Sequence, residues 1–193
     1  MARPREFDTD DVLEKAMQAF WSGGYEATSL ADLTRAMGIS KSSFYEAFGS
    51  KHALYLATIE RYGDTAAERT VGLLENSTWA KGAIAAVFEF VIDAATAEGP
   101  RRGCFINNCA VETASRDGAV ASRVIGCLDR IEAAFENAVA RGQEAGDIPS
   151  GHDAHALARF LASSLQGLIV TAKANPEKAK LNDIVRVVLT TLD

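Results

Sequence analysis

The sequence predicts an all-α protein, and three observations support this fold class. Alanine, which has the highest helix propensity, is the most frequent residue, and only four prolines occur in 193 residues. Apolar residues recur every three or four positions along most of the chain, which is the spacing of an amphipathic helix. No Asn-Gly or Asp-Gly pair lies between alternating β-branched residues, as a β-hairpin would require. We therefore expect about nine helices.

The overall composition is that of a globular protein. Hydrophobic residues make up 48% of the chain and charged residues 24%, a balance that excludes a disordered chain. The three cysteines are too few, and odd in number, for a disulfide framework. No apolar stretch approaches the ~20 residues that cross a bilayer, and residues 1–11 are polar rather than leader-like. We expect a soluble cytoplasmic protein with no membrane partner.

Side chains that can cap helices divide the N-terminal part of the chain. The first helix is expected to begin after the Asp8-Thr9-Asp10 cluster and to end at Gly23-Gly24. Ser29 begins a second, short helix, with Asp32 three residues later completing a weak capping box. This helix stops at Gly38, because glycine readily ends a helix.

A third short helix follows directly after a tight turn. Ser40 can cap a helix over residues 41–48, and Ser50 can cap a long helix that runs from Lys51 towards Thr78. Two short helices joined by a glycine-containing turn, after a longer first helix, form the helix-turn-helix arrangement. Generic helical domains also contain such turns, so the spacing alone leaves DNA binding open.

The charge balance gives no support to a nucleic-acid binder. The net charge is −6, and residues 1–51 contain more Asp and Glu than Lys and Arg. DNA binding must therefore depend on where the charges point rather than on their sum.

The residues of this region carry a family resemblance. Phe20-Trp21, Gly24 to Leu30, Met37 to Tyr45 and Phe48 to Lys51 resemble the N-terminal domain of the TetR family of transcriptional regulators. The resemblance covers roughly the first 60 residues without gaps. It implies a helix-turn-helix DNA-binding domain over residues 1–60 and a ligand-binding and dimerisation domain over residues 61–193. It also implies a homodimer, most often a repressor, that binds a double-stranded, palindromic DNA operator.

The resemblance and the helix positions together assign the DNA-facing residues. Lys41 would contact base edges from the start of the recognition helix, whereas Tyr45, Thr28 and Lys51 would contact phosphates. Lys51 could instead be a solvated side chain. The complete set of residues assigned to DNA is Arg3 and Arg5 on an N-terminal arm, Thr28, Ser29, Lys41, Ser42, Ser43, Tyr45 and Lys51.

The second half of the chain contains five further expected helices. They cover residues 82–98, 104–115, 118–145, 153–174 and 176–192, with Pro176 in the first turn of the last one. We assign the last two to the dimer, because their apolar residues would be exposed to a partner and form a four-helix interface. These interface residues are Phe160, Leu161, Leu165, Leu168, Ile184, Val188 and Leu192.

Residues 103–112 place two amides and two thiols among apolar residues, and two interpretations stay open. The thiols fill core space and the asparagines bond to backbone, or the polar groups belong to a ligand pocket. The pocket would suit a small, mainly apolar or aromatic effector. Its expected residues are Tyr62, Phe88, Cys104, Phe105, Asn108 and Phe135.

A thiol function of Cys104 is the alternative. The Gly-Cys-x-x-x-Asn pattern resembles a TetR branch in which some members sense electrophiles or oxidants through this thiol. Arg101-Arg102 and the nearby helix start would lower the pKa of Cys104. A redox sensor or a thiol enzyme centred on Cys104 is therefore the rival hypothesis.

Other chemistry has little support in the sequence. There is no glycine-rich phosphate loop or nucleophile elbow, so we expect neither an enzyme nor a cofactor. His152 and His155 can share a helix face but lack a third ligand, so no metal site is expected.

Overall fold

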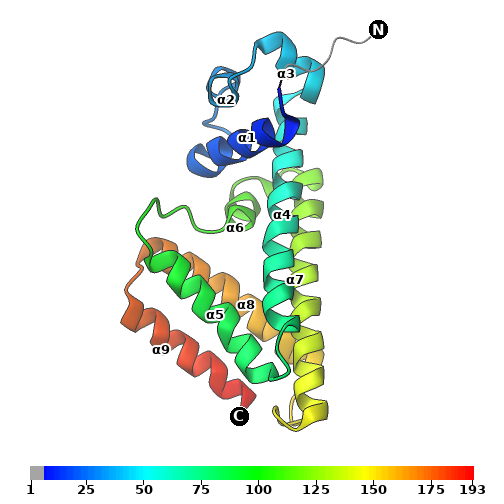
Figure 1. The fold of residues 1–193 in the computed structure, drawn as a ribbon, viewed down its shortest axis with the longest axis vertical. Helices are drawn as coiled ribbons and strands as arrows, with labels where there is room; N and C mark the ends of the chain where they lie inside the picture. The colour runs from blue at the N-terminus through cyan, green and yellow to red at the C-terminus, as the bar shows by residue number, and fades with distance from the viewer. Residues whose placement is uncertain (1–6) are drawn as a thin grey trace.

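The computed structural model describes residues 7–193, and all the regular secondary structure in this range is helical (Figure 1). The assigned DNA-contacting residues Arg3 and Arg5 lie outside the described residues. The α-helices are α1 (Thr9–Gly23), α2 (Leu30–Met37), α3 (Lys41–Phe48), α4 (Lys51–Glu75), α5 (Ala80–Thr96), α6 (Phe105–Cys109), α7 (Gly118–Ala145), α8 (Ala154–Ala174) and α9 (Lys178–Leu189).

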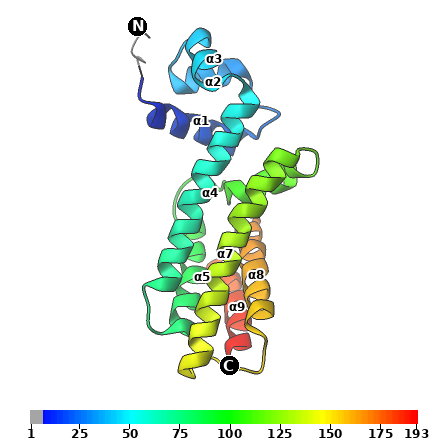
Figure 2. The same ribbon diagram turned by 90° about the vertical axis from the view of Figure 1, so that its right-hand side faces the viewer.

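The helices form two groups that share α4. Helices α1 to α3 lie at one end of the molecule, around the first turns of α4 (Figure 1). Helix α4 then continues into the other group, where it packs along α7 and against α5, and α8 and α9 complete the bundle (Figure 2). In the described part of the chain, no helix is long and apolar enough to span a bilayer.

The expected capping residues begin the helices in the structure. Asp8 Oδ1 accepts a hydrogen bond from the Asp10 backbone N–H at 2.9 Å at the start of α1. Ser29 and Asp32 form the predicted capping box at the start of α2, with both bonds present. Ser40 and Ser50 cap α3 and α4 through their hydroxyl oxygens. The first four helices are therefore confirmed to within a few residues.

The predicted helix over residues 104–115 is divided in the structure. It consists of α6 followed by a π-helical turn over Ala110–Ala114. A π-turn contains one extra residue per turn, and an analysis based on a 3.6-residue period does not detect it. The expectation for Pro176 is also wrong, because the chain is still extended at Glu177 and α9 begins at Lys178.

The last two helices bury most of the residues that were expected to be free. Packing of α8 on α7 and α5, and of α9 on α5 and α8, encloses these side chains within a single protomer. The expectation that they are exposed is wrong for Leu161, Leu165, Leu168, Val188 and Leu192, which are buried, and Ile184 is half-buried. Phe160 alone of the set is exposed, at 46%. The spacing of apolar residues along a helix identifies which face is buried. It does not show whether that face is covered by the same protomer or by a partner.

Two glycines of α7 provide a matched test of this packing. An added Cβ at Gly142 would lie 2.7 Å from Ile148 Cδ1 and 2.8 Å from Ala80 Cβ, whereas Gly126 has open space around it. Gly142→Ala should therefore destabilise the fold, since overpacking costs ~1–3 kcal/mol and the gain in helix propensity is smaller.

Gly126→Ala is the control, and it should stabilise the fold by ~0.5–1 kcal/mol through helix propensity alone. Urea unfolding followed by circular dichroism gives both free energies. Equal changes in the free energy of unfolding for the two variants would contradict the close packing at Gly142.

Candidate functional site

Helix α3 presents a polar face to solvent and anchors itself through aromatic residues. Phe44 is fully buried, and its ring lies 6.0 Å from that of Phe48, which is partly buried. Tyr45 is 49% exposed, and Lys41 is exposed without an ion-pair partner among the described residues. The helix therefore offers a cation and a phenol on its outer side.

Three serines form a cluster at the start of α3. Ser40 Oγ lies 2.8 Å from Ser42 Oγ and 2.9 Å from Ser43 Oγ, and it accepts from the Ser43 backbone N–H. The first turn of α3 contains no acidic residue. Its N-terminus thus carries hydroxyl groups and the positive end of the helix dipole, which favour an anion such as a phosphate.

The other residues assigned to DNA already have partners within the protein. Thr28 is 5% exposed, and its hydroxyl donates to the Gly24 carbonyl at 2.6 Å. The Ser29 hydroxyl contacts Asp32 within the capping box. Lys51 Nζ lies 4.4 Å from the centroid of the Tyr25 ring. The Lys51 ammonium contacts only this ring face, and its three N–H donors are not used in a hydrogen bond within residues 7–193. The contribution of all three residues to DNA binding stays a prediction.

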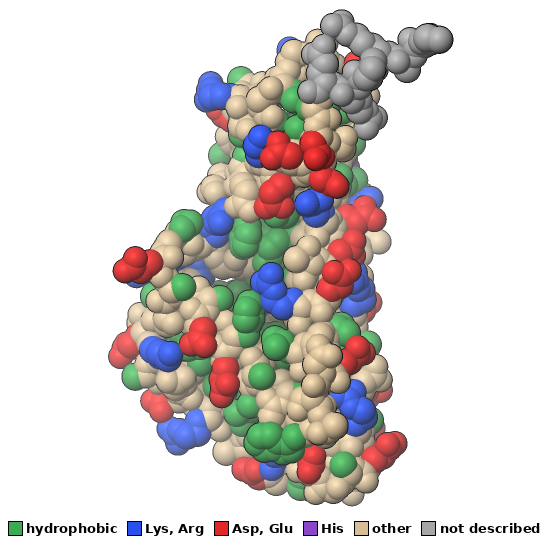
Figure 3. All heavy atoms as spheres, viewed as in Figure 1, with side chains coloured by type: hydrophobic (Ala, Val, Ile, Leu, Met, Phe, Trp, Pro, Cys, Tyr) green, Lys and Arg blue, Asp and Glu red, His purple; other side chains and the backbone are tan. Residues whose placement is uncertain are grey.

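The acidic residues of α1 are paired with cations. Arg61 of α4 contacts Asp10 at 3.1 Å and Glu14 at 3.4 Å, and Lys15 contacts Asp11 at 2.6 Å. Figure 3 shows acidic side chains gathered in the region of α1, below α3. The negative charge of α1 is thereby partly neutralised, whereas the exposed Glu46 lies on α3 itself.

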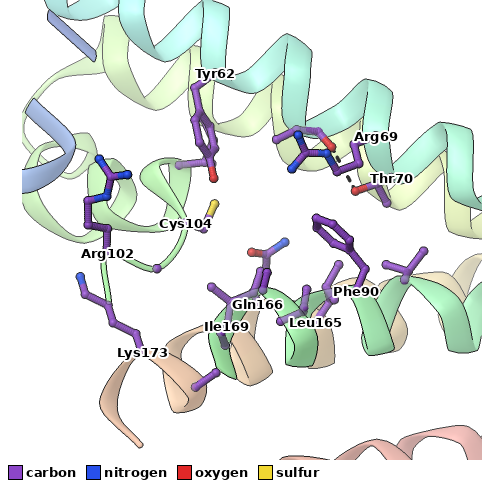
Figure 4. A pocket seen from close by; sticks show the side chains of 18 of the residues that line it. Tyr62, Arg69, Thr70, Phe90, Arg102, Cys104, Leu165, Gln166, Ile169 and Lys173 are labelled. Atoms are coloured by element: carbon purple, nitrogen blue, oxygen red, sulfur yellow. Dashed lines mark hydrogen bonds between the residues drawn. The ribbon is translucent and has the colours of Figure 1, made fainter. Parts of the chain in front are cut away.

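A cavity of about 350 Å³ lies in the second group of helices, between α4, α5 and α8. Its apolar wall includes Phe90, Leu165 and Ile169, and its polar wall includes Tyr62, Cys104 and Gln166 (Figure 4). Trp21 of α1 also lines it. The helix group that carries α3 therefore supplies part of the cavity wall.

Two family models cover most of the chain. The model described as bacterial regulatory proteins, tetR family, matches residues 12–58, and the tetracyclin repressor-like C-terminal domain matches residues 80–188. The chain belongs to the TetR family. The transition between the two matches falls largely within α4, the helix that both groups of the fold share.

Two relatives that match this TetR-family chain over nearly its whole length are transcriptional regulators. The transcriptional repressor ComR of Escherichia coli is 36% identical, with 98% of this chain and 90% of ComR covered. The uncharacterized HTH-type transcriptional regulator YezE of Bacillus subtilis is 33% identical, with both chains covered completely.

A solved structure of a TetR-family regulator has the same fold. The regulator CifR, in a cysteine mutant complexed with a 26-bp double-strand operator DNA, has a TM-score of 0.87 and 31% identity. The similarity covers 99% of this chain and 100% of that one. The fold and the relatives are those of DNA-binding transcriptional regulators rather than of enzymes.

The structure brings together only part of the pocket that the sequence predicted for this TetR-family chain. Tyr62 and Cys104 line the cavity, but Phe88 and Phe135 pack against each other in the core, with centroids 6.2 Å apart. Phe105 is buried against Tyr62 rather than exposed to the cavity. Aromatic residues in phase on a helix do not reveal which of them face a void.

The predicted polar anchor Asn108 acts on the protein itself. Its Nδ2 donates to the Arg102 carbonyl at 3.0 Å, and its Oδ1 accepts from Lys173 Nζ at 2.8 Å. Sequence reasoning missed Trp21, Arg102, Lys173 and Gln166 as cavity residues. Gln166 carried a usable signal, since it is a polar side chain within the apolar run of residues 165–170.

The thiol of Cys104 is not activated in this structure. Burial raises the pKa of Cys104, and bonds from the Tyr62 hydroxyl and from backbone N–H groups offset this only in part. The Arg102 side chain, which was expected to lower the pKa, is turned towards Trp21 and Gln18 of α1. The expected lowering of the pKa is therefore wrong.

Burial raises the pKa of the other two cysteines as well. Burial raises the pKa of Cys109 to about 12 and that of Cys127 to about 11. All three cysteines are free thiols. The structure supports the packing interpretation for Cys109 and Cys127, which are buried in the core.

The raised pKa values predict slow alkylation of Cys104, Cys109 and Cys127. A raised pKa leaves less thiolate at a given pH, so at about pH 7.5 iodoacetamide should react with Cys109 and Cys127 at least ~10-fold more slowly than with a free thiol, and with Cys104 more slowly than with a free thiol. Peptide mass spectrometry resolves the three sites, and the rates should keep rising with pH beyond the ordinary thiol pKa, where the rate of a free thiol has levelled off.

The same chain unfolded in urea is the control, because there all three thiols should react at equal, ordinary rates. Labelling of Cys104 in the folded protein as fast as in the unfolded protein would contradict the buried, protonated thiol.

Proposed function

We propose that this protein is a repressor that binds a palindromic operator as a homodimer and releases it when a small, mainly apolar effector enters the cavity. In this proposal residues 1–60 bind DNA, residues 61–193 bind the effector and form the dimer, and the protein acts in the cytoplasm, where a bacterial operator is found. The observation that carries it is the position of Trp21, which belongs to α1 beside the helix-turn-helix and lines the cavity.

Two observations support operator binding: the outer face of α3 and the related regulators. The outer face of α3 offers Lys41, Tyr45 and a hydroxyl-rich N-terminus to an anionic duplex. CifR, which is similar over the whole chain, was solved with a 26-bp operator DNA. Two copies of α3 related by a two-fold axis would enter successive major grooves, which implies a palindromic site.

Three contacts support coupling between the cavity and α1 to α3. They lie on the segment that follows Cys104: the Glu26 backbone N–H donates to Glu112 Oε1 at 3.1 Å, the Tyr55 and Thr113 hydroxyls lie 3.3 Å apart, and His52 Nε2 lies 2.6 Å from Asp117 Oδ2. A ligand that displaces this segment therefore shifts the loop between α1 and α2 and the first turns of α4, which adjoin α3. By linkage, ligand and operator would weaken each other's binding by one factor, typically ~5–150-fold.

The dimer in this proposal uses the outer face of α8 and α9. Phe160 and Val170 of α8 are 46% and 55% exposed, and Val187 of α9 is 62% exposed. Exposed large apolar side chains on adjacent helices are typical of a surface that is buried by a partner. These residues replace the buried leucines as candidates for the interface.

The thiol alternative receives less support. Cys104 lines the cavity, so a reagent that enters could reach it, but its raised pKa disfavours the nucleophilic thiolate. Reversible occupancy of the cavity is therefore the better mechanism.

The DNA-facing residues can be tested on double-stranded DNA that the wild-type protein selects from a random library. Tyr45→Ala and Lys51→Ala should weaken binding about equally across sequences and reduce its salt dependence, because both are assigned to phosphates. Lys41→Ala should instead relax base preference by ~1–3 kcal/mol at one position of each half-site.

Lys180→Ala is the matched control, since Lys180 is exposed, has no ion-pair partner among residues 7–193, and lies on α9 at the end of the molecule opposite α3 (Figure 1). Wild-type affinity of both Tyr45→Ala and Lys51→Ala, measured by fluorescence anisotropy, would refute the assigned orientation of α3.

The proposed dimer surface predicts that an added charge has different effects at exposed and at buried positions. Phe160→Glu and Val187→Glu should raise the dimer dissociation constant by roughly a hundredfold or more, because an unpaired charge is costly in an apolar interface. Leu168→Glu should unfold the protomer instead, since Leu168 is 1% exposed.

Ile125→Glu on α7 is the control, because it adds the same charge at a side chain that is 55% exposed but lies outside α8 and α9. Ultracentrifugation and circular dichroism separate the outcomes. A dimer that survives both Phe160→Glu and Val187→Glu would place the interface elsewhere.

A further inference from the structure

The cavity is lined by cations in a protein that is acidic as a whole. Arg69, Arg101, Arg102 and Lys173 line it, against a single acidic lining residue, Glu98. The chain carries 26 acidic and 20 basic residues, so this local excess opposes the overall charge. None of the four cations forms an ion pair with a carboxylate of residues 7–193.

Two of these cations are fixed together at the end of the cavity nearest α1. The Arg102 guanidinium lies 4.4 Å from the centroid of the Trp21 ring and donates to Gln18 Oε1. Lys173 Nζ is bonded to Asn108, which is bonded in turn to the Arg102 carbonyl. Both cations thus have neutral partners only. Figure 4 shows Arg102 and Lys173 beside Cys104, with Arg69 and Phe90 at the opposite end.

A buried donor at the same end has no acceptor. Trp21 Nε1 is buried, and no hydrogen-bond partner for it exists among the described residues. A buried indole N–H ordinarily finds a partner, because leaving it unpaired is costly. An anionic oxygen at this end of the cavity would lie close to the two cations and near this unpaired N–H.

The remainder of the cavity is suited to an apolar body. Phe90, Leu165 and Ile169 form much of the wall between the two ends, and Gln166 contributes one amide whose Oε1 is buried without a donor. A cavity of about 350 Å³ lies within the range of small-molecule sites. A ligand that fills it would bury mostly hydrocarbon and present few polar groups.

We propose that the effector is an apolar monoanion, in particular a carboxylate, whose charged group binds between Trp21, Arg102 and Lys173. Its body then extends between α4, α5 and α8 towards Phe90. Asn108 is a positioning residue, because it holds the Lys173 ammonium and the Arg102 backbone without lining the cavity. This inference rests on the proposed function, since it assigns a chemical class to the effector of the same cavity.

The position of the charged group also gives the ligand a direct contact with α1. A carboxylate paired with the Arg102 guanidinium, which itself contacts Trp21 and Gln18 of α1, would act on the helix that precedes the helix-turn-helix, in addition to the segment that follows Cys104. The arrangement disfavours a cationic ligand of the same shape, which would meet at least two unpaired positive charges.

The test uses Trp21 as its own reporter. The chain has two tryptophans, and Trp79 lies outside this cavity, so Trp79→Phe leaves emission from Trp21 alone. The probes are decanoate, decanamide and decyltrimethylammonium, with 4-phenylbutyrate and 4-phenylbutanamide as a second body. Each is titrated for Trp21 emission and for displacement of the selected operator DNA.

The carboxylates should bind at least ~10-fold more tightly than their amides, since hydrogen bonds to a charged group are about twice as strong as neutral ones. Lys173→Gln and Arg102→Gln should remove most of this preference. Arg69→Gln, at the other end of the cavity, should change it by no more than about threefold, and the control Lys180→Gln should leave it unchanged.

Two results overturn the inference without touching the proposed function: equal binding and operator release by amide and carboxylate, or tightest binding by the ammonium compound. If no probe changes either Trp21 emission or operator affinity, the inference is overturned together with the effector part of the proposed function. Operator binding in the absence of probe, measured in the same titrations, tests the remaining part separately.

Discussion

The continuous burial of α4 is the constraint on which the rest of the structure depends. Its first turns carry Leu54, Tyr55 and Ile59 into the core beneath α1 and α3, while later turns carry Ala67 and Leu74 into the core beneath α7. Gly63 lies between these two regions, and a Cβ there would be 3.4 Å from Cys127 Cβ. The small residue allows α7 to approach closely, so the two ends of the molecule are joined by a packed rod rather than by a linker.

This continuity explains why a cavity in one half can be relevant to the other. A packed core is not continuously deformable, so a displaced element moves as a unit with its neighbours. The π-turn over Ala110–Ala114 contacts the loop between α1 and α2 through Glu112, and it contacts α4 through Thr113. An irregular turn at this position is a feature that functional helices often carry.

The sequence allowed the helix positions to be predicted because the information is local. Ser29, Ser40, Ser50 and Asp153 bond to backbone groups within three residues, so a cap can be recognised without knowing the fold. Phe20, Leu33 and Phe44 are buried in the core of the first three helices.

The cavity and the dimer surface could not be predicted to the same depth, because both depend on contacts distant in sequence. Trp21 and Lys173 are 152 positions apart in the printed numbering, and no pattern in either segment indicates that they line one void. Similarly, Leu168 and Phe160 are both apolar residues of α8, and only the positions of α5 and α7 decide that one is enclosed and the other free.

The pairing of Asp10, Asp11 and Glu14 with Arg61 and Lys15 has a consequence for how the protein finds its site. These ion pairs occupy Arg61 and Lys15, two cations close to α1, and the chain as a whole is negative. Non-specific affinity for DNA comes almost entirely from cations that neutralise phosphates, so under the proposed function arbitrary sequence should hold this protein weakly. Fewer molecules would then be sequestered along the chromosome, and a small number of copies per cell would be enough to keep an operator occupied.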